Sequence, residues 1–377
     1  MSRTQLRGVL LVGRAALRSY IQEQLRRRSF LIEGNNAVVH IDVPDNPAGT
    51  PSGYDVYLTG WETPLLSEEI VTERAARPAQ GDTDTDTDTD TDTDTNINTN
   101  TDSEGVPSTA FPGYICHVTG TMKNIVPRAF VSSPDWIVSN WGTAISSFVS
   151  EMTLTLLLSC ARRLPEANLL LTDASRAGEA GWKQNDFYPT GTSLYRKRVG
   201  LYGYGRIGRE FAHLLNPFGV QVSVYDPYCD LDDESVVSHQ CESLSELFAD
   251  NDVVSIHCAL TPQTRGSVGT RLLQLMPDDG IVINTARAAV IDETALREAV
   301  LHSSLRFGLD VFHREPPDPE DPIVTSPRVV ATPHSANEVG EDQYAAMWNV
   351  VEQNLIRYLS GLRPHFPVDE TTYDRMT

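Results

Sequence analysis

The segment that most constrains the fold is residues 199–226, VGLYGYGRIGREFAHLLNPFGVQVSVYD, which has every part of a strand–helix–strand unit in order. An apolar strand predicted over 198–202 leads into Gly203, Gly205 and Gly208, and a helix and a second apolar strand follow. In such a unit the glycines permit a tight turn, close approach of the backbone to a pyrophosphate, and close packing of helix on strand. Unpaired N–H groups at the helix start favour the phosphates. The segment therefore predicts a dinucleotide site.

The second strand of this unit ends on Asp226, eighteen residues beyond Gly208. A carboxylate at this point can accept hydrogen bonds from a ribose 2′-hydroxyl, and it repels a 2′-phosphate. We therefore expect NAD rather than NADP as the cofactor.

Length and charge narrow the class of protein. A chain of 377 residues is expected to form two domains. With 30 basic and 51 acidic residues its net charge is −21, which argues against nucleic acid or an anionic membrane as partner.

The five cysteines include no CxxC pair, which favours reduced thiols in a cytoplasm. The apolar run at 8–12 is too short for a signal sequence, and no run reaches the length of a membrane span. We expect a soluble, cytoplasmic protein.

Residues 81–102, GDTDTDTDTDTDTDTNINTNTD, have almost nothing apolar to bury. Such a segment cannot offset the entropy lost on ordering, so we predict a disordered insertion over about 78–108. Its regularly spaced oxygens also suggest calcium binding. The repeat lacks the glycine and terminal Glu of a calcium loop, however, so a solvated tract is the favoured interpretation.

Strands and helical patterns alternate on both sides of this insertion, which predicts two α/β domains with parallel sheets. A long amphipathic helix is predicted over 146–173, and a last helix over 341–359 that could pack back on the first domain. The predicted strands are 8–12, 37–41, 54–58, 114–118, 135–139, 198–202, 252–257, 280–284, 305–309 and 329–331.

Polar side chains follow the last three of these strands, where each strand ends. Arg287 follows the first of the three, Asp310 and Glu315 follow the second, and His334 follows the third. Ligands of open α/β sheets bind outside the carboxyl ends of the strands. We therefore expect these residues to line one crevice.

Four strings resemble the D-isomer-specific 2-hydroxyacid dehydrogenase family in their order and spacing: VGLYGYGRIGRE, INTARAAVIDETAL, GLDVFHREPP and VVATPHSA. The resemblance covers roughly residue 114 to the C-terminus outside the Asp-Thr tract, and it is most specific over 199–336. Residues 140–165, NWGTAISSFVSEMTLTLLLSCARRLP, are also similar to the family's domain crossover and long helix.

The resemblance implies the domain plan. The fold class is α/β with two doubly wound parallel-sheet domains. A Rossmann NAD-binding domain (140–337) is inserted into a smaller flavodoxin-like substrate domain (1–139 plus 338–377). Substrate would bind between the domains, whose closure excludes water. A homodimer through the long helix is expected, with packing inside one chain as the alternative.

The resemblance further implies that Arg287, Glu315 and His334 form the catalytic set. The guanidinium fork of Arg287 suits a 2-oxo acid, whose carboxylate must be held and whose carbonyl must be polarised. His334 would supply the proton that the carbonyl oxygen needs after hydride transfer. Glu315, bonded to the far ring nitrogen, would fix the tautomer and favour imidazolium.

Other residues have expected roles as well. Asp310 is expected near the nicotinamide amide, His257 is interpreted as a packing residue, Lys197 is expected on the surface, and no metal site is expected. The residues predicted to bind NAD are Gly203, Tyr204, Gly205, Arg206, Ile207, Gly208, Asp226, Thr264, Thr285, Ala286 and Asp310.

The predicted substrate loop departs from the family pattern. In VTGTMKN, residues 118–124, Gly120 is kept, but the acidic residue of an Asp-Asn pair is absent and Lys123 adds a cation. We expect Thr119, Gly120 and Thr121 to bind the substrate carboxylate through their backbone, together with Arg287. The departure leaves the identity of the 2-hydroxy acid open.

The sequence thus predicts an NAD-dependent oxidoreductase that interconverts a 2-oxo acid and a D-2-hydroxy acid. One alternative is an NAD-sensing regulatory or binding protein on the same fold, because fold alone does not decide function. Another is a formate- or phosphonate-type dehydrogenase, which would still use Arg287 and a base.

Overall fold

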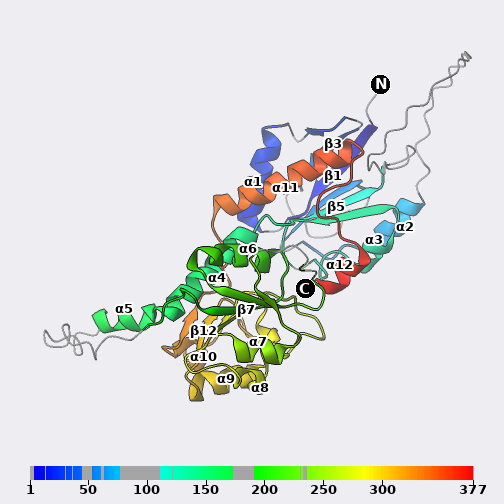
Figure 1. Ribbon diagram of the computed structural model, residues 1–377. Helices are drawn as coiled ribbons and strands as arrows, with labels where there is room; N and C mark the ends of the chain where they lie inside the picture. Colours follow the sequence, from blue (N-terminus) through cyan, green and yellow to red (C-terminus); the bar gives the residue numbers. More distant parts are fainter. Residues whose placement is uncertain are drawn as a thin grey trace, which may run out of the picture. The chain divides into compact units, whose positions relative to one another are not determined.

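The computed structural model describes residues 4–12, 14–29, 31–35, 37–44, 53–60, 63–76, 111–120, 122–172, 191–229, 231 and 236–376. The predicted insertion at 78–108, with its Asp-Thr tract, lies outside these residues, as do Thr121 and Asp173. The chain divides into two compact units, Met1–Gly142 with Tyr344–Met376, and Thr143–Gln343 (Figure 1). The sequence suggested borders after residues 139 and 337.

The first unit is built on a six-stranded sheet in the order β2-β3-β1-β4-β5-β6. Apart from β2, which pairs antiparallel with β3, the strands are parallel. Without β2 the order is that of a flavodoxin-like doubly wound sheet. The sequence did not indicate β2, because three residues are too few to show a periodic pattern. The strands are β1 (Thr4–Leu10), β2 (Leu31–Glu33), β3 (Ala37–Asp42), β4 (Val56–Thr59), β5 (Gly113–His117) and β6 (Trp136–Asn140).

The last long helix of the chain packs on this first sheet, as the sequence suggested. The ring of Tyr358 stacks on that of Tyr114 in β5, with 4.9 Å between centroids. Gly34 allows the approach, because a Cβ there would lie 2.4 Å from the Cβ of Leu359. The first unit is therefore built from both ends of the chain. Its helices are α1 (Ala15–Arg26), α2 (Glu69–Ala75), α3 (Arg128–Ser132), α11 (Glu341–Leu359) and α12 (Glu370–Arg375).

The second unit has a seven-stranded sheet in the order β13-β12-β11-β10-β7-β8-β9, and every pair is parallel. The chain begins at β7 in the middle, winds outward to β9, and then returns to β10 on the other side. This is the strand order of a Rossmann fold with one added strand. The strands are β7 (Arg198–Tyr202), β8 (Gln221–Tyr225), β9 (His239–Gln240), β10 (Val253–Ile256), β11 (Ile281–Asn284), β12 (Arg306–Leu309) and β13 (Val329–Ala331).

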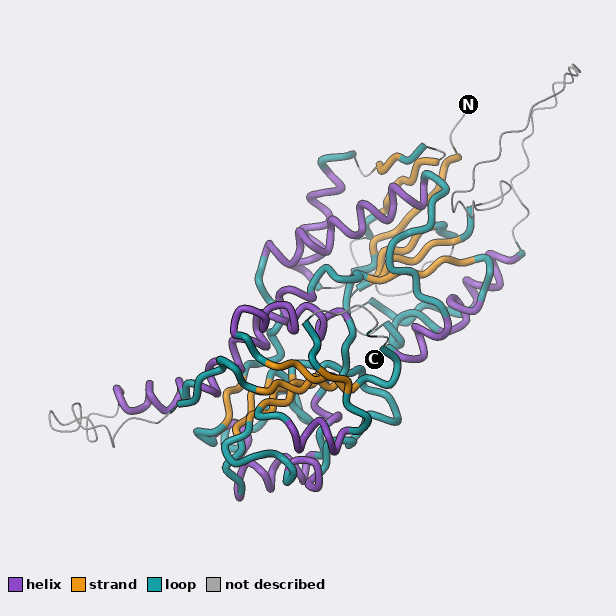
Figure 2. The backbone as a smooth tube through the Cα atoms, in the orientation of Figure 1, coloured by secondary structure: helices purple, strands orange, loops and turns teal. Residues whose placement is uncertain are grey.

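Helices cover both faces of this sheet (Figure 2), and each face has its own core. Val253 packs into one core and Val254 into the other, which explains why these strands are continuous apolar runs. Ser243 and Asp292 cap two of the helices, each accepting a bond from a main-chain N–H. The helices are α4 (Ser146–Ala161), α5 (Leu164–Thr172), α6 (Arg206–Leu215), α7 (Leu244–Asp250), α8 (Thr270–Leu273), α9 (Glu293–His302) and α10 (Pro322–Thr325).

The single long helix predicted over 146–173 is wrong, because the chain breaks it into α4 and α5. Pro165 has no N–H to donate to the carbonyl of Ala161, and that carbonyl accepts a bond of 2.7 Å from the N–H of Thr192 instead. Arg163, between the helices, has a φ of 52°. The predicted apolar face of α4 packs inside the second unit, against α6 and strands β11 to β13.

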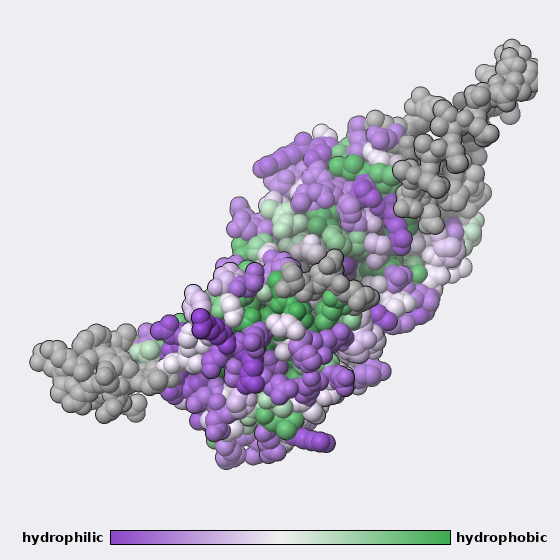
Figure 3. Space-filling view, in the orientation of Figure 1, coloured by the Kyte–Doolittle hydropathy of each residue, from purple (hydrophilic) through white to green (hydrophobic). Residues whose placement is uncertain are grey.

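No helix in the described part of the chain is long and apolar enough to cross a membrane. Hydrophilic residues cover most of the face of the molecule that Figure 3 shows.

Candidate active site

The glycine turn between β7 and α6 has the geometry that a dinucleotide needs. Gly203 has a φ of 96°, and a Cβ there would lie 2.6 Å from the main-chain nitrogen of Cys258. A Cβ on Gly208 would lie 2.6 Å from the carbonyl oxygen of Gly203. At Gly205, by contrast, an added Cβ would meet nothing within 4 Å. Gly203 and Gly208 thus allow close packing. Gly205 leaves a space in front of the helix, and a pyrophosphate fits such a space.

The residues around these glycines support the turn. The Tyr204 ring is buried, and the guanidinium of Arg209 lies 4.5 Å from its centroid. Arg206 begins α6, and burial lowers the pKa of its guanidinium. The carbonyl of Ile207 accepts a bond of 3.2 Å from Ser150 Oγ in α4.

Asp226 directly follows β8, beside the glycine turn. Its Oδ2 accepts a bond of 2.8 Å from the N–H of Tyr204, and its Oδ1 accepts one of 2.9 Å from the N–H of Tyr228. Because each carboxylate oxygen has two lone pairs, both can accept a further hydrogen bond. The position and the acceptors suit a ribose hydroxyl.

The end of β11 is shaped by Asn284, a residue that sequence reasoning missed. Its buried amide accepts a bond of 3.0 Å from the N–H of Ala286 and donates one of 3.0 Å to the carbonyl of Arg287. Thr285 Oγ1 lies 2.9 Å from Thr153 Oγ1 in α4. An Asn that ends an apolar strand is a typical former of such a turn, so the signal was present in the sequence.

Thr264 lies in the turn that follows β10. Its Oγ1 donates a bond of 2.6 Å to the carbonyl of Ala259 and accepts one of 2.8 Å from the N–H of Thr261. The threonine is half-buried and stabilises its own loop.

Arg287 lies between β11 and α9. Its Nη1 donates a bond of 2.7 Å to the carbonyl of Ala286. Burial lowers the pKa of the guanidinium, and the negative charge of Glu315 partly opposes this effect. A half-buried guanidinium whose pKa is lowered is stabilised when an anion such as a carboxylate binds beside it.

Glu315 and His334 form a bonded pair. Glu315 Oε2 lies 2.8 Å from His334 Nδ1, and its Oε1 accepts a bond of 3.1 Å from the N–H of Phe312. Burial by itself would raise the pKa of Glu315, but the bonds from His334 and Phe312 and the charges of His334 and Arg287 leave it below its ordinary value. The two side chains are 41% and 46% exposed, so a substrate can reach the imidazole.

Asp310 connects the end of β12 to the residues on both sides of His334. It is buried, and it accepts bonds of 2.6 Å from Thr332 Oγ1, 2.8 Å from the N–H of Ser335 and 3.0 Å from the N–H of Ala336. His334 itself has a φ of 53°, in the left-handed region. The buried carboxylate therefore holds the short segment that carries the histidine.

The predicted substrate loop lies in the first unit. Thr119 is buried, and its Oγ1 lies 3.1 Å from Nε2 of His117, whose Nδ1 lies 3.0 Å from Thr59 Oγ1. Burial lowers the pKa of His117 to about 3, so this histidine is neutral. Gly120 is half-buried.

Lys123, which the sequence suggested as an added cation beside the substrate loop, has another partner. Its Nζ donates to the carbonyls of Asp374, at 3.2 Å, and of Met376. It also lies 5.8 Å from the ring centroid of Tyr373. The lysine thus connects α12 to the body of the first unit.

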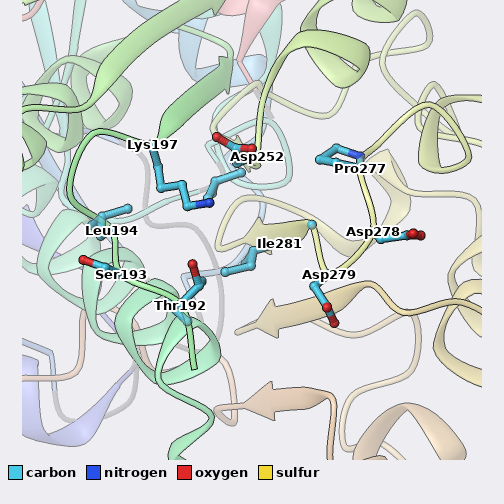
Figure 4. Close-up of a pocket in the computed structure, with 12 residues that line it drawn as sticks. Thr192, Ser193, Leu194, Lys197, Asp252, Pro277, Asp278, Asp279 and Ile281 are labelled. Atoms are coloured by element: carbon cyan, nitrogen blue, oxygen red, sulfur yellow. The ribbon is translucent and has the colours of Figure 1, made fainter. Parts of the chain in front are cut away.

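Two other residues singled out by the sequence lie away from the bonded pair. His257 has its ring 2.9 Å from Ser255 Oγ and against Phe211, and burial lowers its pKa to about 3, in line with a packing role. Lys197, expected on the surface, is half-buried and lines a cavity of about 90 Å³ together with Asp252 and Ile281 (Figure 4). This cavity lies at the amino ends of β7, β10 and β11, opposite the edge that carries Arg287.

Comparison with known proteins identifies relatives of this chain. Residues 154–336 match the family described as D-isomer specific 2-hydroxyacid dehydrogenase, NAD binding domain. A D-3-phosphoglycerate dehydrogenase of Methanocaldococcus jannaschii is 37% identical over 219 residues, which cover 58% of this chain and 40% of that protein. A glyoxylate reductase of Aeropyrum pernix is 31% identical over 231 residues, which cover 60% of this chain and 68% of that protein.

The sequence similarity covers only part of the chain, whereas the structural similarity covers nearly all of it. The chain spans about 40% of the length of the phosphoglycerate dehydrogenases that it matches. The solved structure of a D-2-hydroxyisocaproate dehydrogenase, 20% identical, superposes with a TM-score of 0.70 over 96% of this chain and 99% of that one, which shows the same fold. The chain therefore belongs to the D-isomer specific 2-hydroxyacid dehydrogenase family, and its second unit contains that family's NAD-binding domain.

Proposed function

We propose that this protein interconverts a 2-oxo acid and its D-2-hydroxy acid with NAD as the cofactor. The observation that carries the proposal is the contact of 2.8 Å between His334 Nδ1 and Glu315 Oε2, in the same unit as the half-buried cation of Arg287. This combination supplies an anion-binding fork, a proton donor and a carboxylate that orients the donor.

Each of the three residues has a separate task in this proposal. Arg287 binds the carboxylate of the 2-oxo acid and polarises the carbonyl at C2. Bound NADH supplies the hydride. Because Glu315 occupies Nδ1 of His334, Nε2 is the nitrogen that gives its proton to the carbonyl oxygen. In the reverse direction the same nitrogen removes the proton from the hydroxyl group.

NAD is proposed over NADP because of the charge on Asp226. The carboxylate stands at the end of β8 beside the glycine turn, where a 2′-phosphate would meet a negative charge. The remaining cofactor residues are proposed as the sequence suggested them, with Asn284 added as a residue that positions Ala286 and Arg287.

The first unit is proposed to supply the main-chain contacts to the substrate carboxylate, at Thr119, Gly120 and Thr121. The buried His117 supports this assignment, because its bond to Thr119 Oγ1 fixes the start of the loop. Lys123 is not proposed as a substrate ligand, since its amine is held by the carbonyls of Asp374 and Met376.

The proposed function is tested by the oxidation of NADH in the presence of a panel of 2-oxo acids. The matched variants are His334→Ala and, as a control, His302→Ala, an exposed histidine on α9. We expect turnover with at least one 2-oxo acid, a loss of about 10²- to 10⁴-fold in kcat for His334→Ala, and little change for His302→Ala. NADH binding without turnover on any acid would instead support an NAD-sensing regulatory protein.

A homodimer and a cytoplasmic location complete the proposal. On α5, Leu164 and Leu169 are 52% and 58% exposed, and a second copy of the chain would cover them. All five cysteines are free, which suits a reducing compartment. Light scattering on Leu169→Asp tests the dimer: a mass that stays that of the unchanged protein would argue against α5 as the interface.

A further inference from the structure

Three metal-ligating side chains meet at the outer edge of the second sheet, away from the glycine turn and the His334–Glu315 pair. They are His239, Cys241 and Glu246, which we call the β9–α7 cluster. One ligand atom of each, a ring nitrogen, Sγ and a carboxylate oxygen, lies within 4.8 Å of the other two. Sequence reasoning named no metal site here, because the three residues match no familiar ligand spacing.

The local fold explains why the three side chains converge. His239 is in β9, and the N–H of Cys241 continues the pairing with β8 through a bond of 2.7 Å to the carbonyl of Val224. Residues two apart along an extended strand point to the same side. The chain then turns into α7, whose first turn carries Glu246.

The helix cap occupies only one oxygen of Glu246. The N–H of Glu246 donates to Ser243 Oγ, and Glu246 Oε2 accepts a bond of 2.7 Å from the N–H of Glu242. The other oxygen, Oε1, lies 2.7 Å from His239 Nε2. The cap therefore fixes the carboxylate and leaves Oε1 for the histidine.

The cluster lies at the border between the core and solvent. Cys241 is buried, whereas the side chain of His239 is 55% exposed, so an ion can reach the three side chains from the histidine side.

We propose that His239 Nε2, Cys241 Sγ and Glu246 Oε1 bind a zinc ion at the edge of the cofactor unit. The mixture of nitrogen, sulfur and oxygen ligands is the one that zinc accepts in tetrahedral geometry, with water in the fourth position. Ligand atoms around tetrahedral zinc lie about 3.3–3.6 Å apart, so small rotations of the three side chains complete the site. On binding, the Cys241 thiol releases its proton to solvent, and the hydrogen that His239 Nε2 shares with Glu246 leaves for solvent or for Nδ1 of the same ring. The contact between His239 and Glu246 is then replaced by two bonds to the metal.

The ion would connect the edge strand β9 to α7, the helix that follows it in the chain. β9 pairs with β8, and Asp226 directly follows β8. We therefore expect zinc to raise the thermal stability of the protein by linkage, independently of turnover. The site goes beyond the proposed dehydrogenase activity and does not depend on it.

The test uses the full-length protein, reduced, freed of metal with a chelator, and titrated with Co²⁺ and then Zn²⁺. Co²⁺ bound to a thiolate gives a charge-transfer absorption that histidine and carboxylate ligands do not give. We expect this absorption in the unchanged protein, its displacement by Zn²⁺, and its loss in Cys241→Ser. The control Cys229→Ser, which removes a half-buried thiol outside the cluster, should keep it.

Two further variants complete the design. His239→Ala and Glu246→Gln should each weaken Zn²⁺ binding at least about tenfold, because each removes one of three ligands. His334→Ala should leave the cobalt absorption unchanged, which separates the cluster from the catalytic pair. Thermal melts of the metal-free variants show whether each one folds, and His239→Ala still decides the question if Cys241→Ser does not fold.

Other results would overturn the proposal. These are the absence of a cobalt–thiolate absorption in the unchanged protein, its persistence in Cys241→Ser, or its loss in Cys229→Ser. Equal Zn²⁺ affinity in His239→Ala and in the unchanged protein would also overturn the zinc site.

Discussion

Glu315 Oε2 lies 2.8 Å from Nδ1 of His334, although the two residues are nineteen positions apart and follow different strands. The contact occupies Nδ1 of His334 and places a carboxylate beside the imidazole. Most of the chemistry proposed for this protein depends on that pair.

Replacing Glu315 by Gln should lower turnover more than NADH binding. The pKa of Glu315 is below its ordinary value, so the residue is a charged carboxylate at neutral pH, and Gln would remove this charge while keeping the size of the side chain. Because the carboxylate is proposed to orient His334 for proton transfer, kcat for 2-oxo acid reduction should fall by about 10²-fold or more. An unchanged kcat in Glu315→Gln would remove Glu315 from the mechanism.

Two glycine variants should separate folding from cofactor binding. Gly208→Ala puts a Cβ 2.6 Å from the carbonyl oxygen of Gly203 and should lower the melting temperature. Gly205→Ala meets no protein atom within 4 Å, so the protein should melt as before but bind NADH at least about tenfold more weakly. Unchanged NADH affinity in Gly205→Ala, measured by fluorescence titration, would place the pyrophosphate elsewhere.

Asp226→Asn should reduce the preference for NADH over NADPH. Asn keeps the size of the side chain but removes the charge that we propose binds the ribose hydroxyls and repels a 2′-phosphate. The loss of a charged hydrogen bond costs about 1.5–3 kcal/mol, so the ratio of kcat/KM values should fall by about 10- to 100-fold. If the ratio stays constant, another residue selects the cofactor.

Asp310→Asn should impair turnover more than NADH binding. The buried carboxylate accepts from two N–H groups beside His334, and an amide would present one of them with an N–H instead of an acceptor. We expect a loss of about 1–3 kcal/mol in the free energy of unfolding and a lower kcat. Asp318→Asn, an exposed carboxylate of the same segment, is the control. A fall in NADH affinity alone would assign Asp310 to the nicotinamide.

His117 should make the first unit sensitive to acid. Burial lowers its folded-state pKa to about 3, whereas the unfolded chain takes up a proton near the ordinary value of 6.5. Between these two values the unfolded state binds more protons. Stability contributed by neutral His117 is therefore present above pH 6.5 and lost as pH falls, by up to about 1.4 kcal/mol per pH unit.

The measurement is urea unfolding from pH 7 to pH 4. In His117→Asn the slope of stability against pH should be smaller than in the unchanged protein. In His40→Asn, which replaces an exposed histidine of the same sheet, the slope should stay the same. Equal slopes in all three proteins would contradict a neutral buried His117.

Local patterns in the sequence were sufficient for much of the fold. The bounds predicted for β7 and β13 agree with the structure, as do the bounds of α11. These elements are determined by apolar periodicity, which depends on residues that are close together in the chain. The residues at the ends of parallel strands were also predictable as a group, because such strands place their carboxyl ends on one edge of the sheet.

Contacts between distant residues decided the rest. The carbonyl of Ala161 bonds to Thr192, which ends α4 where periodicity alone continued the helix, and Lys123 meets carbonyls more than 250 positions later. The sequence by itself determined the longer strands, their turns and their ends, since these depend on neighbouring residues, whereas the three-residue strand β2 showed no pattern. Only the tertiary structure decided which polar groups meet, as in the β9–α7 cluster, because a hydrogen bond or metal site depends on atoms that the fold brings within a few ångströms.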